Sequence, residues 1–207
     1  MKLQFGNLSI NEKTIARLHE LGFTPETLQE AIYEHQSNGD GEPTVYVGTY
    51  AKYNEGSICG LWIDLTSFSS YYDFIKFCKA IHSDEEDPEL MAQDYEGFPS
   101  SYYYEGFINE NDFDKIIEYS QLCEKYPAEA VSAYIESIGS DDISNFEYDY
   151  CGEWDDEEDY ARHVIEECYD IDRTMGHLSI YFDYEAFARD LFMTDYRMAE
   201  GYVFRVA

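Results

Sequence analysis

An excess of acidic side chains is the feature that most limits what this chain can fold into. The 207 residues include 44 Asp and Glu against 13 Lys and Arg, a formal net charge of −31 at pH 7. A high net charge is typical of disordered chains. The chain also contains 21 Tyr, 13 Phe and 2 Trp, however, and these residues favour folding. Because each aromatic side chain buries about 150–250 Å², we expect a folded protein whose tyrosine hydroxyls reach water.

The same charge excludes two classes of partner. Nucleic acids are bound through basic patches that neutralise phosphates, and an anionic membrane surface repels an acidic protein. The chain has no apolar run near the ~20 residues that a membrane helix needs, and residues 1–7 lack the apolar core of a signal peptide. We therefore expect a cytoplasmic protein that binds neither nucleic acid nor membrane.

Metal and cofactor sites are not expected. The cysteines are odd in number, far apart and without a CxxC pair, which indicates reduced thiols; they are Cys59, Cys78, Cys123, Cys151 and Cys168. Phosphate-binding loops, GxGxxG and HExxH motifs are absent. The acidic runs at 84–89 and 155–159 lack the ligand spacing of a calcium-binding EF-hand.

Catalysis is not expected either. Paired carboxylates among aromatic residues are typical of carbohydrate-active hydrolases. With 44 acids, however, close pairs arise by chance almost anywhere, and no single pair stands out. We therefore expect a protein that is not an enzyme, and we keep the hydrolase only as the weakest alternative.

Residue patterns predict an α+β fold. Apolar stripes at helical spacing predict helices over about 12–20, 25–36, 70–81, 110–122, 127–138, 156–169 and 184–193. Alternating β-rich runs predict strands over 44–50, 57–65, 90–95, 143–151, 178–182 and 202–206, the first two as an antiparallel hairpin. The strand at 143–151 would place Glu147 and Asp149 on one face. Asp155 with Glu158 is the expected capping pair of the helix that begins at 156.

Shifts in composition along the chain predict four parts. Residues 1–42 form a helical N-terminal extension that ends in a linker rich in Ser, Asn and Gly. Residues 43–100 form an α+β unit built on the antiparallel hairpin, residues 101–141 a helical middle unit, and residues 142–207 a C-terminal α+β unit.

Many acids lie on elements that we expect to be ordered. Eight acids and no base occur from Glu147 to Asp159, and seven acids and no base from Asp84 to Glu96. Alternate residues on a strand project about 6.6 Å apart. Residues four apart on a helix, such as Asp155 and Asp159, have Cβ atoms about 5–6 Å apart. Phosphates along DNA are spaced on a similar scale, so an ordered carboxylate surface can offer a basic groove what a duplex offers.

The placement of the acids predicts a set of partner-binding residues that act as phosphate mimics. They are Asp84, Glu85, Glu86, Asp87, Glu89, Asp94, Glu96, Asp141, Asp142, Glu147, Asp149, Glu153, Asp155, Asp156, Glu157, Glu158, Asp159, Glu166, Glu167 and Asp170. The partner would be a DNA-binding enzyme whose groove is lined with Lys and Arg. A general acidic binder or chaperone of basic proteins is the alternative, because it needs only the charge.

Five sequence blocks in a fixed order carry a family resemblance. They are VYVGTY at 45–50 with YNEG at 53–56, GLWID at 60–64, QDYEGF at 93–98, GEWDDEEDYA at 152–161, and DYEAFARDLF at 183–192 followed by GYVFR at 201–205. Their order and spacing over residues 43–206 resemble the ArdA antirestriction proteins, which are DNA mimics carried by conjugative plasmids and transposons. Residues 1–42 depart from that family's pattern.

The resemblance implies a shape, an assembly and a function. It implies an elongated, curved chain of three small α+β and helical units, and a homodimer joined through the C-terminal units. It implies inhibition of type I restriction-modification enzymes by occupying the DNA groove of the methyltransferase core, with acids arrayed as DNA phosphates.

Overall fold

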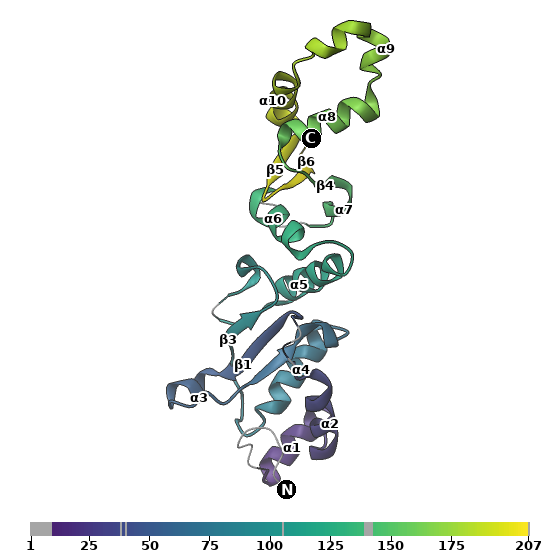
Figure 1. Cartoon of the computed structure of the whole chain (residues 1–207). Helices are drawn as coiled ribbons and strands as arrows, with labels where there is room; N and C mark the ends of the chain where they lie inside the picture. The colour runs from purple at the N-terminus through teal and green to yellow at the C-terminus, as the bar shows by residue number, and fades with distance from the viewer. Residues whose placement is uncertain (1–9, 38, 40, 105, 139–142, 207) are drawn as a thin grey trace. The chain divides into compact units, whose positions relative to one another are not determined.

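The computed structural model describes residues 10–37, 39, 41–104, 106–138 and 143–206 (Figure 1). The chain divides into two compact units, Met1–Gln121 and Leu122–Ala207. Each unit combines helices with one three-stranded antiparallel sheet, so the expected α+β class is confirmed. The finer division into four parts stays a prediction. None of the described helices is long and apolar enough to cross a membrane.

The first unit begins with a helical hairpin of α1 (Glu12–Glu20) and α2 (Pro25–His35). Asn11 caps α1, because its side chain accepts from the Lys13 and Thr14 backbone N–H groups. Thr24 caps α2, which has Pro25 at its first position. Both helices begin where the sequence predicts them, directly after these caps.

The sheet of the first unit has the order β2-β1-β3, with β1 (Thr44–Thr49) between β2 (Leu61–Asp64) and β3 (Leu90–Glu96). The hairpin of the first two strands and the third strand are confirmed. The return strand is shorter than predicted and begins only after Gly60. The backbone at Gly60 lies so close to β1 that a Cβ atom at Gly60 would come within 2.6 Å of the Val47 carbonyl oxygen.

Helices complete this unit around a core rich in aromatic rings. They are α3 (Tyr50–Asn54), η1 (Leu65–Ser67), α4 (Tyr71–Ile81), η2 (Ser100–Tyr102) and α5 (Glu110–Cys123). Helix α4 begins after Ser70, as predicted, and buries Phe74 and Phe77. Helix α3 replaces the turn expected there, because the Thr49 hydroxyl accepts from the Lys52 backbone N–H and caps a helical turn.

The second unit contains a sheet of order β4-β6-β5. Its elements are α6 (Ala128–Ile138), α7 (Phe146–Asp149), β4 (Tyr150–Glu153), α8 (Glu157–Cys168), α9 (Ile171–Met175), η3 (Gly176–Tyr181), α10 (Tyr184–Thr194), β5 (Tyr196–Ala199) and β6 (Tyr202–Arg205). The core includes Tyr134, Phe146 and Phe204, whose rings lie 5.3–6.2 Å apart. The expected helix stop at Gly139 lies outside the described residues.

The predicted strand at 143–151 is wrong: residues 146–149 form the helical turn α7, and only β4 is extended. Phe146 and Tyr150 stack with ring centroids 5.3 Å apart. Residues four apart meet in this way on a helical turn, whereas Tyr148, between them in the alternation, is exposed. The alternate aromatic residues therefore fit both the two-residue repeat of a strand and the helical repeat that brings residues four apart together. Burial of Phe146 selects the helical turn.

Two other predictions fail in the second unit. The strand expected at 178–182 is 3₁₀ helix η3, which buries no residue and is paired to no described strand. Strand β5 was not predicted, although it pairs with β6 through a tight turn at Glu200 and Gly201. Both turn residues have positive φ, 50° and 84°, as a two-residue hairpin of the primed type requires.

Candidate protein-binding surface

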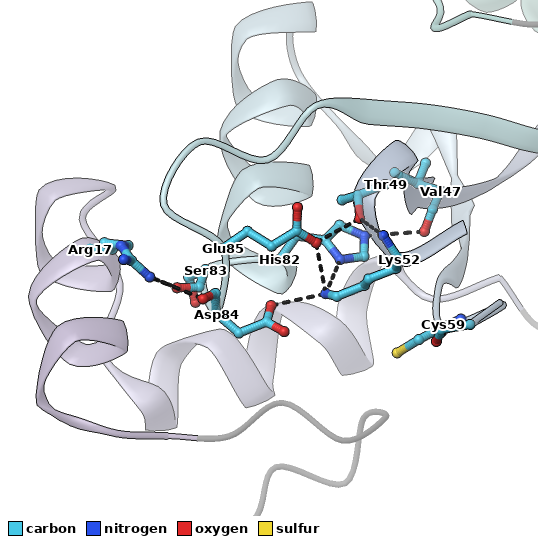
Figure 2. Close-up of polar contacts among 10 residues, drawn as sticks. Arg17, Val47, Thr49, Lys52, Cys59, His82, Ser83, Asp84 and Glu85 are labelled. Atoms are coloured by element: carbon cyan, nitrogen blue, oxygen red, sulfur yellow. Dashed lines mark hydrogen bonds and ion pairs between the residues drawn. The ribbon is translucent and has the colours of Figure 1, made fainter. Parts of the chain in front are cut away.

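The acidic loop at 84–89 joins α4 to β3 in the first unit. A cluster of polar side chains holds its first two acids (Figure 2). The Lys52 Nζ lies 2.9 Å from Asp84 Oδ1 and 3.5 Å from Glu85 Oε1, and the Thr49 hydroxyl donates to Glu85 Oε1 at 2.6 Å. Two of the predicted phosphate mimics are therefore bound to groups of their own chain.

His82 lies at the centre of this cluster and is fully buried. Its Nε2 lies 3.3 Å from the Val47 carbonyl oxygen, and its Nδ1 lies 2.9 Å from Lys52 Nζ. Burial, followed by the charge of Lys52, lowers the pKa of His82 to about 4. The ring is therefore neutral at pH 7, with the Nε2–H donating to Val47 and Nδ1 accepting from the ammonium.

The same cluster has the composition of a metal site. The ligand atoms of His82, Asp84 and Glu85 lie within 4.8 Å of one another, and a neutral imidazole with two carboxylates suits several divalent transition metals. The Lys52 ammonium, however, lies within 2.9 Å of the His82 and Asp84 ligand atoms and supplies the positive charge there. The arrangement therefore works as an internal ion pair that anchors the loop.

The remaining predicted phosphate mimics of the first unit face solvent. Glu86, Asp87 and Glu89 follow the anchored part of the loop, and all are exposed. Asp94 and Glu96 lie two residues apart on β3, an edge strand of the sheet, and are exposed as well. Side chains two apart on a strand project from one face, so these two carboxylates point the same way.

Several predicted mimics of the second unit are engaged within the chain. Glu147 pairs with Lys125 at 2.9 Å, and Asp149 accepts a hydrogen bond from the Tyr134 hydroxyl at 2.7 Å. The hydrogen bond to Glu147 raises the pKa of Lys125. Because Glu147 and Asp149 lie on α7 rather than on a strand, the expected one-face spacing of this pair is wrong.

The N-terminus of α8 is the most acidic ordered segment. Asp156 caps the helix by accepting from the Asp159 backbone N–H at 2.8 Å, so the predicted capping pair of Asp155 and Glu158 is wrong. Asp155 precedes the cap, and it does not share a helical face with Asp159. Glu158 instead pairs with Arg162, whose guanidinium lies 4.1 Å from the centre of the Tyr184 ring.

Buried residues of α8 and their neighbours hold this segment in place. Tyr160, Ala161 and Ile165 are buried on the inner face of α8. Trp154 packs edge-on against Tyr160, and its indole N–H donates to the Cys151 carbonyl oxygen at 2.9 Å. The acids of the first turn, Glu157 to Asp159, are also favoured there by the helix dipole.

Ten of the predicted residues are exposed and have no side-chain hydrogen bond or ion pair within the described parts of the chain. We call them the free carboxylate set: Glu86, Asp87, Glu89, Glu96, Glu153, Asp155, Glu157, Asp159, Glu166 and Glu167. Asp94 accepts from the neighbouring Tyr95 N–H, and Asp170 caps α9. Asp141 and Asp142 lie outside the described residues.

Two open hollows of the second unit are lined by acids. One, of about 650 Å³, lies between α8 and α10 and has Glu157, Glu185, Phe192 and Met193 in its wall. The other, of about 640 Å³, is lined by residues of α8 and α9 that include Glu166, Glu167, Asp170 and Asp172. The second hollow has no cation among its lining residues and suits the basic side chains of a partner, whereas the wall of the first also contains Arg189.

The residues that hold the acidic loop were not predicted from the sequence. Lys52, Thr49 and Arg17 are 32 to 67 positions from the loop residues they contact. No local pattern reports such a pairing, because it depends on how the helices and the sheet pack. The weak available signal was the scarcity of cations, which makes each of the 13 Lys and Arg a candidate counter-charge.

Comparison with known proteins identifies the family of the chain. The family model described as "Antirestriction protein (ArdA)" matches residues 45–204, most of the chain. No curated protein sequence matches the chain. The matched span includes both sheets except Thr44 and Arg205 at their ends, and it includes every member of the free carboxylate set, while α1 and α2 lie before it. The chain therefore belongs to the ArdA antirestriction protein family.

Proposed function

We propose that this protein inhibits type I restriction-modification enzymes in the cytoplasm by occupying the DNA-binding groove of their methyltransferase core. The observation that carries the proposal is the free carboxylate set: unpaired acids exposed on helices, strands and the loops that join them in an antirestriction protein. The carboxylates stand where DNA phosphates would bind, and the protein acts by binding rather than by catalysis.

Electrostatics supports this reading. Counter-charges are scarce, since 13 cations face 44 acids, and three of the described cations are used in ion pairs with Asp84, Glu85, Glu147 and Glu158. The field of the remaining acids extends over about a Debye length, 8–10 Å in physiological salt. Such a field attracts a basic groove and speeds the encounter.

We also propose that the protein is a homodimer joined through the C-terminal unit. The segment of α9 and η3 buries no residue. It exposes a group of large apolar side chains, namely Met175, Leu178, Ile180 and Tyr181, and Tyr169 at the end of α8 is exposed as well. Apolar surface of this extent on an otherwise acidic protein favours contact with another protein surface, and a second copy presents the same segment.

Displacement of DNA tests the proposed mechanism. A type I methyltransferase core is bound to labelled target DNA, and the protein is titrated in. We expect complete release of the DNA, with an affinity that falls steeply as salt rises, because the contacts are ion pairs. DNA that stays bound at saturating protein would refute the proposal. Equal affinity for unrelated basic proteins would indicate a general acidic binder instead.

A further inference from the structure

We propose that the α1–α2 hairpin is a working part of the partner-binding surface, because Arg17 on α1 fixes the acidic loop that follows α4. In this view Arg17 is a positioning residue. It holds the loop so that Glu86, Asp87 and Glu89 meet the basic groove of the partner in one arrangement. The inference rests on the proposed function, and it assigns a role to a hairpin that lies outside the family match.

Arg17 contacts the backbone of the loop, not its carboxylates (Figure 2). Its Nη1 donates to the carbonyl oxygens of Ser83 and Asp84 at 3.0 and 3.1 Å. These carbonyls lie two and three residues after Ile81, the last residue of α4, close to the negative end of the helix dipole. A guanidinium is well suited to this position, since it supplies both donors and positive charge.

The loop is held from a second side by the family-matched part of the chain. Lys52 and Thr49 bind the carboxylates of Asp84 and Glu85, while Arg17 binds the backbone of the same stretch. The first half of the loop is therefore fixed at both main chain and side chain. The second half, with Glu86 and Asp87, follows directly, so the fixed first half limits the positions that these two residues can take.

The hairpin is a rigid base for Arg17. Leu18 and Leu28 are fully buried, and Ile32 is nearly so. His35 at the end of α2 stacks on Phe68, with ring centroids 4.0 Å apart, and meets the edge of Phe77 on α4. A helix packed in this way holds its side chains to a narrow range of positions. The two hydrogen bonds from Arg17 to the loop, which we call the brace, are therefore held in place by a rigid element.

Net charge alone and the proposed positioning role predict opposite changes in affinity when Arg17 is removed. Arg17 is a cation near a surface that must bind a basic groove, so its removal makes the protein more negative and should strengthen long-range attraction. Loss of the brace instead leaves the loop to be ordered at the moment of binding, which weakens affinity. The sign of the change therefore separates positioning from simple charge.

The test compares Arg17→Gln with Lys13→Gln, which removes the same charge from an exposed residue of α1. The readouts are the Kd for the methyltransferase core and hydrogen exchange of the amides at 83–89. We expect R17Q to bind about three- to tenfold more weakly than wild type, with faster exchange in the loop. K13Q should bind as wild type or slightly more tightly, with unchanged exchange.

The outcomes separate this inference from the proposed function. If wild type displaces DNA and R17Q binds as tightly as K13Q, the brace is refuted and the proposed function stands. If wild type does not bind the core at all, the proposed function fails. Thermal melting reports whether R17Q is folded at the assay temperature. If it is not, Arg17→Met, which keeps the apolar stem, takes its place in the same comparison.

Discussion

At the scale of single residues, the cluster around Lys52 shows how this acidic protein places its few cations. The Lys52 ammonium forms ion pairs with Asp84 and Glu85 and donates a hydrogen bond to the neutral Nδ1 of His82. Side chains that are only 15–29% exposed make these contacts, so screening by solvent is weaker than at an open surface pair. The cations thus stabilise the fold where acids are anchored, and leave the outward acids free.

His82 gives a pH-dependent stability. Its folded pKa of about 4 lies below the ordinary value of 6.5, so the unfolded state binds more protons than the folded state between these values. The stability from the neutral ring is complete above pH 6.5 and is lost as pH falls toward 4, by about 3 kcal/mol at most. Urea unfolding at several pH values, for wild type and His82→Gln, measures the loss.

The comparison with the variant is needed because carboxylates also titrate in this range. As pH falls, their protonation relieves self-repulsion in both proteins, and the difference in unfolding free energy cancels this effect. We expect wild type to lose stability relative to H82Q on acidification. A difference that does not change between pH 7 and pH 4.5 would contradict the buried neutral histidine.

Residue-scale features were predictable where the pattern is local. The caps at Asn11, Thr24 and Ser70 follow from a polar residue placed directly before an apolar helical stripe. The partners of Asp84 were not predictable, because Lys52 and Arg17 lie far from it in the sequence. Exposure of an acid is therefore easier to predict than whether it is free to bind a partner.

At the scale of elements, the first turn of α8 concentrates the acids on a packed helix. Asp156 caps this helix, and the sequence predicted Asp155. We expect Asp156→Ala to lower the free energy of unfolding by about 1 kcal/mol, since it removes the acceptor for the Asp159 N–H. Asp155→Ala should have almost no effect on stability. Equal losses in the two variants, measured by urea unfolding, would show that the cap is assigned to the wrong residue.

Helix α8 and strand β4 before it offer a direct test of the free carboxylate set. We expect the triple variant Glu153→Gln, Glu157→Gln and Asp159→Asn to bind the methyltransferase core at least tenfold more weakly, with a shallower salt dependence, because three ion pairs are lost. The matched control neutralises three exposed acids outside the set, Glu110→Gln, Asp114→Asn and Glu129→Gln. Equal weakening in both triples would mean that only the total charge matters.

Elements were predicted well where one period was unambiguous. The α4 stripe of Phe74, Phe77, Cys78 and Ile81 fits only a helix, and it forms one. Residues 146–150 carry aromatics at spacings that fit both a strand and a helical turn, and only burial of Phe146 decides between them. At 178–182 the β-rich composition has no described neighbouring strand to pair with, and the chain forms η3.

At the scale of the whole molecule, the proposed homodimer depends on the exposed segment of α9 and η3. Ile180 and Tyr181 are 78% and 76% exposed, so charges placed there leave the fold intact. We expect wild type to elute with the mass of a dimer and Ile180→Lys with Tyr181→Lys to elute as a monomer, by light scattering. Tyr33→Lys, at a residue 90% exposed on α2, is the control and should stay dimeric. A monomeric wild type would contradict the proposal.

Carboxyl footprinting of the complex tests the central claim most directly. The protein is labelled with a carbodiimide reagent, alone and bound to a type I methyltransferase core, and the labelled residues are identified by mass spectrometry. We predict protection of the free carboxylate set on binding, reversed by excess target DNA, with no change at Asp84, Glu85 and Asp149, which are bound within the chain. Free carboxylates that stay fully reactive in the complex, or protection that DNA does not reverse, would contradict DNA mimicry.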